Sequence, residues 1–201
     1  QLILDPDLDT YYAMDAFLIR MPDLVERLVK NVDPVQGILQ TKRPFTVKER
    51  TQLWGEFNVL QYQIENISYD KNATIVESVK YSNMKEELER ELSPRATALE
   101  SAHRAMVEMT QKVVYDERTT GAPDVTPVAW ANGVDNLLNS ADAYWGVLLE
   151  QMSHMLNKRI EARAASRNGK LAIVALLVLS TLVFTFLVMR SITGPIAKAK
   201  A

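Results

Sequence analysis

The stretch DPDLD, residues 5–9, carries an aspartate at every second position. Carboxylates at this spacing are the first ligands of a calcium-binding loop, which also needs Gly at its sixth position and Glu at its twelfth. Those two positions hold Thr10 and Ala16, so an EF-hand is excluded.

The same stretch also has the composition of a helix start. We expect Asp5 to be the N-cap and Pro6 to occupy the first helical position. Asp7 and Asp9 then fall in the first turn, where carboxylates stabilise the positive helix end by about 0.3–1 kcal/mol each. A direct contact with a ligand or cation remains the alternative.

Four residues are candidates for ligand binding. Tyr12 and Asp15 lie three apart and share a helical face. Arg20 precedes Pro22, which frees a backbone carbonyl and kinks a helix, and its guanidinium can grip a carboxylate. Trp130 opens the last helix and is the fourth candidate. Packing in the core for Tyr12 and a solvated or salt-bridged state for Arg20 are the alternative interpretations. Arg43 is a weaker version of the arginine candidate.

Three tryptophans, Trp54, Trp130 and Trp145, are expected on different helices and could line a pocket. Trp145 falls on an apolar seam and is predicted to be core, whereas Trp130 is expected to be partly exposed. The methionines have the spacing of a flexible core stripe. We expect no metal site and no cofactor, and no catalytic constellation appears in these residues, so no enzymatic activity is expected of them.

These candidates are expected on four helical stretches. The first is predicted over about residues 7–31, ending before Asp33-Pro34. The second begins at Thr46, with Glu49 at capping-box spacing. Its seam alternates four- and three-residue steps, typical of helices packed side by side: Leu53, Phe57, Leu60, Ile64 and Ile67.

The third stretch is clearest from Leu99 onward. The place where the second helix gives way to the third is ambiguous within residues 68–83. Pro94 is expected either to kink this helix or to mark its true start. A loop is predicted over residues 119–127, and Thr126-Pro127 resembles an N-cap and first-turn pair. The fourth seam is the longest: Val134, Leu138, Ala141, Trp145, Leu148, Met152 and Met155.

Residues 171–189 contain no charged side chain. Nineteen residues at about 1.5 Å each span roughly 28 Å, which is close to the hydrocarbon thickness of a bilayer. We therefore predict a transmembrane helix over residues 169–190. No proline separates it from the fourth helix, so the two are expected to form one rod, with Gly169 as its weakest point.

The sequence thus predicts an all-α protein: an antiparallel, four-helix-type bundle continuous with a C-terminal transmembrane helix. A formal net charge of −2 and a pI of about 5.8 argue against nucleic acid as a partner. Cysteine is absent, which excludes disulfides, thiol catalysis and cysteine-ligated zinc. Long helices on a thin core often gain a second chain as packing partner, so a homodimer is expected.

The residues after the apolar segment, MRSITGPIAKAK (189–200), resemble the opening of a HAMP domain, a coiled-coil relay that follows the last membrane helix of bacterial receptors. The resemblance implies a HAMP start at 191–201 in the cytoplasm. It also implies a periplasmic sensor region over residues 1–168 and a location in the bacterial inner membrane.

The stretch LILDPDLDTYYAMDAFLIRMPDL (2–24) is similar to the extracytoplasmic sensor regions of two-span bacterial signalling proteins, above all methyl-accepting chemotaxis proteins. The resemblance implies transmembrane signal transduction, a small-molecule or periplasmic protein stimulus, cytoplasmic signalling partners and an earlier membrane helix before Gln1. A membrane diguanylate cyclase or histidine kinase is the first alternative. A membrane-anchored structural coiled coil without ligand is the second.

Overall fold

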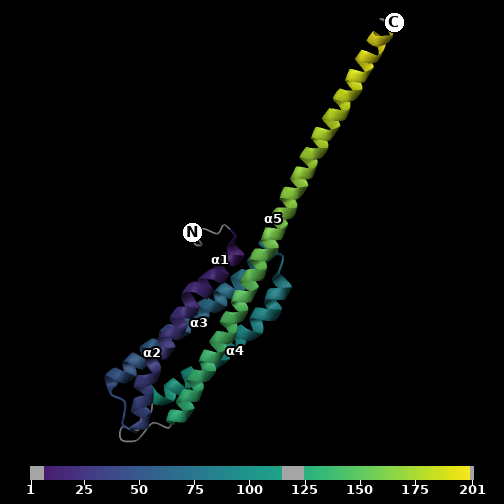
Figure 1. Cartoon of the computed structure of the whole chain (residues 1–201). Coiled ribbons are helices and arrows are strands. Elements are labelled where there is room, and N and C mark those ends of the chain that lie inside the picture. The colour runs from purple at the N-terminus through teal and green to yellow at the C-terminus, as the bar shows by residue number, and fades with distance from the viewer. Residues whose placement is uncertain (1–6, 115–124, 200–201) are drawn as a thin grey trace. The chain divides into compact units, whose positions relative to one another are not determined.

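The computed structural model describes residues 7–114 and 125–199, and within these ranges it contains helices and no strands (Figure 1). The chain divides into two compact units, residues 1–156 and 157–201. The first unit is an all-α bundle in which helices pack against one another, so the predicted fold class is confirmed.

The first arm of the bundle consists of α1 (Leu8–Asp15), a π-helical turn η2 (Ala16–Arg20) and α2 (Met21–Gln40). Asp7 stands at the N-cap position with an extended backbone, so its predicted place in the first turn is wrong, whereas Asp9 lies in that turn. The predicted roles of Asp5 and Pro6 lie outside the described residues.

The arm does not end before Pro34, as the sequence predicted. It continues through this proline to Gln40, and Val35, Ile38 and Leu39 are buried beyond it. A proline inside a helix removes one backbone hydrogen bond at a cost of about 3 kcal/mol. Burial of three large apolar side chains, at about 1.5–3 kcal/mol each, outweighs that cost.

The π-helical turn stands directly before Pro22, where a kink was predicted. A π turn bonds residues five apart and inserts one extra residue into a helix. Ala16 and Met21, five positions apart, are both buried, at 1% and 0% exposure. The turn therefore keeps the core face of α1 and that of α2 on the same side of the arm, next to α3.

The second arm, α3 (Val47–Tyr81), begins at the predicted capping box. The backbone N–H of Thr46 donates to the Glu49 carboxylate (2.8 Å), and the Glu49 N–H donates to the Thr46 hydroxyl (3.3 Å). All five predicted seam residues are buried. The helix ends at a turn in which Asn83 has a φ of 53°. The boundary between the second and third helices, ambiguous in the sequence, therefore lies between Tyr81 and Lys85.

The third arm, α4 (Lys85–Val114), runs back beside α3. It contains Pro94 in its interior, so the prediction that Pro94 marks the start of the helix is wrong. Ser68 of α3 donates its hydroxyl to the Glu100 carboxylate of α4, which ties the two helices together.

The last helix, α5 (Pro127–Ala199), begins at the predicted cap, where the N–H of Ala129 donates to the Thr126 hydroxyl (3.1 Å). Four of the seven predicted seam residues are buried, namely Val134, Ala141, Leu148 and Met155. The other three, Leu138, Trp145 and Met152, are only half-buried, and Leu137, Tyr144 and Gln151 are buried beside them. The fully buried positions up to residue 155 are Trp130, Val134, Leu137, Ala141, Tyr144, Leu148, Gln151 and Met155.

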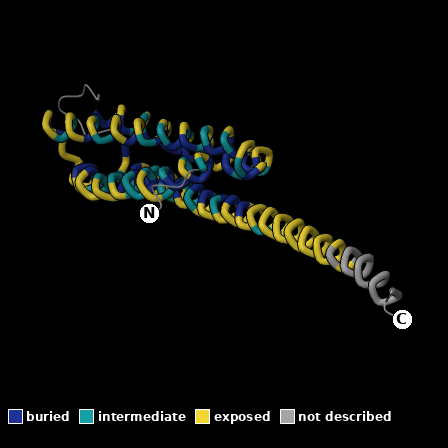
Figure 2. Tube along the Cα trace, turned by 90° about the horizontal axis from the view of Figure 1, so that it is seen from above, coloured by how far each residue is buried: buried dark blue, intermediate teal, exposed yellow. Residues whose placement is uncertain are grey.

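Exposure differs between the two parts of α5. Within the first unit the buried faces turn toward the other helices, as the dark blue of Figure 2 shows. From Leu171 to Phe184 every described side chain is exposed, although most are apolar. By length and composition, α5 is the one helix among the described residues that could span a membrane.

Candidate functional site

The core of the bundle changes character along α3. Its first buried residues are apolar, from Leu53 to Ile67, and three of the next four buried residues are Asp70, Thr74 and Ser78. These are buried polar side chains, at 2%, 0% and 0% exposure. Buried polar groups need partners, so this part of the core is the place to look for a site.

Asp70 is held by Arg20, which the sequence had singled out. The Arg20 guanidinium donates through Nε to Asp70 Oδ2 (2.7 Å) and pairs through its Nη2 with Asp15 Oδ2 (2.8 Å). One cation thus bridges a carboxylate of α1 and a carboxylate of α3 from the π-helical turn between α1 and α2. We call Asp15, Arg20 and Asp70 the ionic bridge.

The ionic bridge holds one positive charge against two carboxyl groups. Burial raises the pKa of Asp70 to about 6, although the hydrogen bond and charge of Arg20 act in the opposite direction. The nearby Asp15 carboxyl raises the Asp70 pKa further. Burial alone would lower the pKa of Arg20, but its bonds to Asp70 and Asp15 raise it on balance. The bridge can therefore take up a proton on Asp70 in mildly acidic solution while Arg20 stays charged.

A fully buried tyrosine of α5 lies near the ionic bridge. Burial and the charge of Asp70 both raise the pKa of Tyr144. Neither the Tyr144 hydroxyl nor the Thr74 hydroxyl has a hydrogen-bond partner among the described residues. Each unpaired buried group costs about 1–3 kcal/mol, so this part of the core is not optimised for stability.

Two of the four predicted ligand residues, Asp15 and Arg20, are brought together in the ionic bridge. Tyr12 lies one turn before Asp15 and packs its ring against Tyr69 of α3 (centroids 6.1 Å apart). Arg20 is salt-bridged, which was the alternative interpretation of this residue. Its guanidinium therefore meets carboxylates of its own chain.

Trp130 lies elsewhere and is not partly exposed, as predicted, but 1% exposed. Its ring packs on Phe57 (centroids 6.0 Å apart). Phe57 is thirteen residues before Asp70 on the same helix, or about 20 Å at 1.5 Å per residue. The predicted set of four thus does not form one site. Trp145, predicted as core, is half-buried against Phe17 (5.7 Å).

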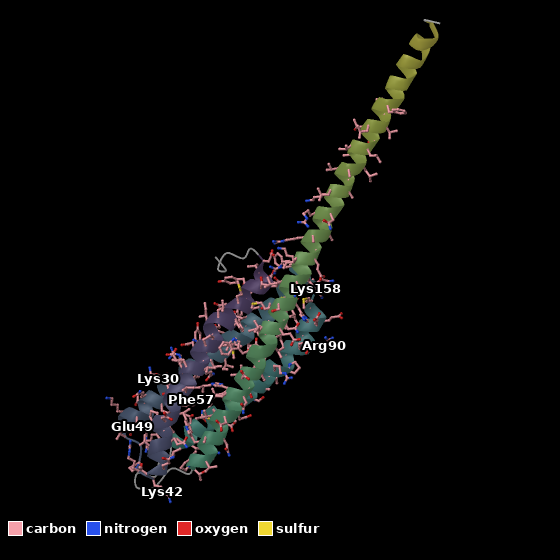
Figure 3. The ribbon with its side chains drawn as sticks, viewed as in Figure 1. Lys30, Lys42, Glu49, Phe57, Arg90 and Lys158 are labelled. Atoms are coloured by element: carbon pink, nitrogen blue, oxygen red, sulfur yellow. The ribbon has the colours of Figure 1, made fainter. Side chains whose placement is uncertain are left out.

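A surface groove of about 370 Å³ lies at the hairpin end of the first two arms. Lys30 and Arg43 bring two cations to it, and Figure 3 labels Lys30 and Glu49 at this end. Glu49 already takes both arms of the Arg43 guanidinium (2.6 and 3.0 Å). Arg43 therefore serves the capping box of α3. Among the described residues, no group of three or more acidic or histidine side chains is placed to hold a metal ion.

Sequence reasoning missed Asp70 and Tyr144. Extending the α3 seam beyond Ile67 by the same steps leads to Lys71 and Thr74, so the pattern pointed to Thr74 and passed beside Asp70. Tyr144 was hidden beside Trp145, the more apolar and larger of two neighbours.

The fold and site define an all-α bundle protein with an internal ionic bridge and one helix apolar enough to cross a membrane. Neither a family model, nor a characterised protein, nor a solved structure matches the chain.

Proposed function

We propose that the protein is a membrane-anchored sensor whose bundle receives a stimulus and whose last helix relays it across the bilayer. The observation that carries the proposal is the continuity of α5. A single helix, Pro127–Ala199, contains both the buried row of the bundle and the exposed apolar segment. A helix that is continuous through both parts can pass a shift or rotation from one to the other.

The proposed class is a methyl-accepting chemotaxis receptor of the bacterial inner membrane, with the bundle in the periplasm and the C-terminus in the cytoplasm. Support comes from the resemblance of residues 189–200 to a HAMP start and of residues 2–24 to receptor sensor regions. A diguanylate cyclase or histidine kinase output would use the same input.

The relay requires a stimulus that binds two states of the bundle with different affinity. A difference of about 1–3 kcal/mol is enough to bias a two-state element. The ionic bridge is the proposed element, because it links α1, the π-helical turn and α3 through one arginine. A ligand that competes for Arg20 or displaces Asp15 would loosen this link.

The membrane placement is tested by single-cysteine labelling, which the cysteine-free chain permits without background. Ser153→Cys on the bundle, Ser180→Cys in the apolar segment and Ser191→Cys beyond it are treated with a membrane-impermeant maleimide on intact cells. Ser153→Cys should react at once and Ser191→Cys only after permeabilisation. Ser180→Cys should stay protected until the membrane is dissolved. Equal labelling of all three in intact cells would refute the proposal.

Sensing is tested separately by thermal unfolding of the full chain in nanodiscs with a library of small polar compounds. A compound that acts through the bundle should raise the midpoint of wild type and not that of Arg20→Met. A purely structural bundle predicts that no compound changes the midpoint and that Arg20→Met leaves signalling untouched.

A further inference from the structure

A second row of regularly spaced side chains runs along α3, on the face opposite its core seam. Its members alternate steps of four and three residues, which is the a/d pattern of a coiled coil. They are Gly55, Val59, Tyr62, Asn66, Tyr69, Ala73 and Val76. We call them the outer row. Tyr62 and Tyr69 are each 62% exposed and Val76 is 64% exposed, so the described residues leave most of their surface uncovered.

The neighbouring helix α4 shows that such a row is not a general property of the bundle. Over Lys85–Val114 no large hydrophobic side chain is exposed. Its outward positions carry charged side chains such as Glu89, Arg90 and Arg95, each of them exposed in the structure. The outer row of α3 is therefore apolar at positions where a solvated helix of the same bundle is charged, which marks a contact surface.

The outer row carries no charged residue, and three polar positions along one of its edges are already paired within the chain. Glu56, Gln63 and Asp70 occupy every seventh position of this edge. Their partners lie on the first arm: Arg27–Glu56 (3.3 Å), Gln63–Asp23 (2.6 Å) and Arg20–Asp70 (2.7 Å). At these three positions two copies can therefore meet without bringing unpaired like charges together.

The apolar surface extends from α3 onto α1. Tyr11, 38% exposed, packs edge-on against Tyr12, which packs against Tyr69 (centroids 5.5 and 6.1 Å apart). An aromatic side chain buries about 150–250 Å² when fully covered. Three partly exposed tyrosines and two valines thus supply a substantial part of the roughly 800 Å² that each partner buries in a stable interface.

We propose that the outer row of α3 is the contact surface for a second copy of this chain. The α3 helices of the two copies pack side by side about a twofold axis, as a parallel two-stranded coiled coil. The parallel direction rests on the proposed membrane placement, because both copies enter the bilayer from the same side.

Asn66 gives the proposal its register. With Val59 and Ala73 at the a positions before and after it, Asn66 is the polar residue at the a position between them. A single asparagine at such a position pairs with its equivalent and specifies two strands in one register, at some cost in stability. In the single chain its amide donates to the Tyr62 carbonyl (2.8 Å), a bond that leaves the side-chain oxygen available.

Cysteine cross-linking of the full chain in membranes tests this contact. Val59→Cys and Asn66→Cys should form inter-chain disulfides under mild oxidation. The matched controls are Gln61→Cys, exposed on the same helix outside the row, and Ala105→Cys, exposed on α4. The row variants should cross-link at least about tenfold faster than the controls, because facing thiols react at high effective concentration.

A paired set of charge variants tests whether the row holds the copies together. Tyr62→Lys/Val76→Lys places like charges across the proposed contact, and self-association of the full chain in nanodiscs should weaken by at least about 100-fold. Gln61→Lys/Val79→Lys adds the same charge beside the row and should leave association unchanged. Circular dichroism shows whether both variants keep their helices.

The inference is overturned if the wild-type chain is monomeric, if controls and row variants cross-link equally fast, or if Tyr62→Lys/Val76→Lys stays as dimeric as its control. Maleimide labelling of Ser153→Cys and Ser191→Cys in the same membranes keeps this result apart from the proposed function. Correct labelling with no self-association refutes the contact alone. Incorrect labelling with an intact dimer refutes the membrane placement and the parallel direction.

Discussion

The core of the bundle has two halves that are built differently along the same helices. Near the connection between α4 and α5, Phe57, Leu60, Trp130 and Leu137 fill the interior with apolar side chains. About three turns beyond Leu60 on α3 and about two turns beyond Leu137 on α5, the core begins to hold polar groups. These are Asp70, Thr74, Ser78, Tyr144 and Gln151. The ionic bridge belongs to this second half.

The difference concerns how many arrangements each half can adopt. Apolar side chains pack as in crystals, and a change of one methylene group is already felt. Polar groups can exchange partners, and several in the second half have none among the described residues. The polar half therefore contributes less to the free energy of unfolding and has alternative bonding patterns available. Both properties suit a part of the bundle that switches between two states.

Truncation in the apolar half should have the largest effect. Trp130→Ala leaves a cavity beside Phe57 and should lower the free energy of unfolding by about 3–5 kcal/mol. For a unit of this size that corresponds to a melting temperature about 6–20 °C lower. Thermal unfolding of the full chain in detergent measures it. The half-buried Trp54→Ala is the control and should lose less, and equal losses would contradict the comparison.

In the polar half, the largest effect should be a dependence on pH. With its pKa raised to about 6, native Asp70 keeps a proton between pH 4 and 6 that the unfolded chain releases. The free energy of unfolding should therefore fall as pH rises through this window, by up to about 1.4 kcal/mol per pH unit. Urea unfolding of wild type and Asp70→Asn at several pH values isolates this contribution, because asparagine does not titrate.

Removal of Arg20 gives the complementary result. Because Arg20 lowers the pKa of Asp70, the variant Arg20→Met should move the decline in stability to higher pH. Identical pH dependence in wild type, Asp70→Asn and Arg20→Met would show that Asp70 is not the responsible group.

Removing the unpaired hydroxyls should change the free energy of unfolding least. The sign of each change shows whether the hydroxyl is unpaired. Tyr144→Phe and Thr74→Val remove buried hydroxyls that have no partner among the described residues. Both should raise the free energy of unfolding by about 1 kcal/mol, since an unpaired buried group costs about 1–3 kcal/mol. A clear loss of stability, measured by urea unfolding, would mean that these hydroxyls are bonded in solution.

Local patterns predicted the ends of helices well where side chains cap the backbone. The Thr46–Glu49 box and the Thr126-Pro127 start depend on residues three positions apart, and the structure confirms both. The end predicted before Pro34 failed because the lost hydrogen bond is outweighed by packing of residues far apart in sequence.

The site was only partly predictable for the same reason. Arg20 was recognisable as a cation beside a proline, but its partner Asp70 is fifty residues away and is selected by how the two arms pack. On α5, two rows of mainly apolar residues lie side by side. Hydrophobicity alone predicted that the row with Trp145 and Met152 would be buried. The helix is rotated so that Tyr144 and Gln151 face inward instead.

The five-residue step from Ala16 to Met21 has a consequence for the arm as a whole. It leaves the chain with one residue more than an unbroken α-helix would use at this point. Deleting a single residue within 16–20 should therefore restore ordinary helical bonding. With one residue fewer, Asp15 and Arg20 would stand four positions apart and still share a helical face. Restoring α-helical bonding with every residue kept would instead turn α1 about 100° relative to α2 and take Asp15 away from Arg20. In the native chain the ionic bridge therefore depends on the π-helical bonding of this turn, which holds the extra residue without rotating one helix against the other.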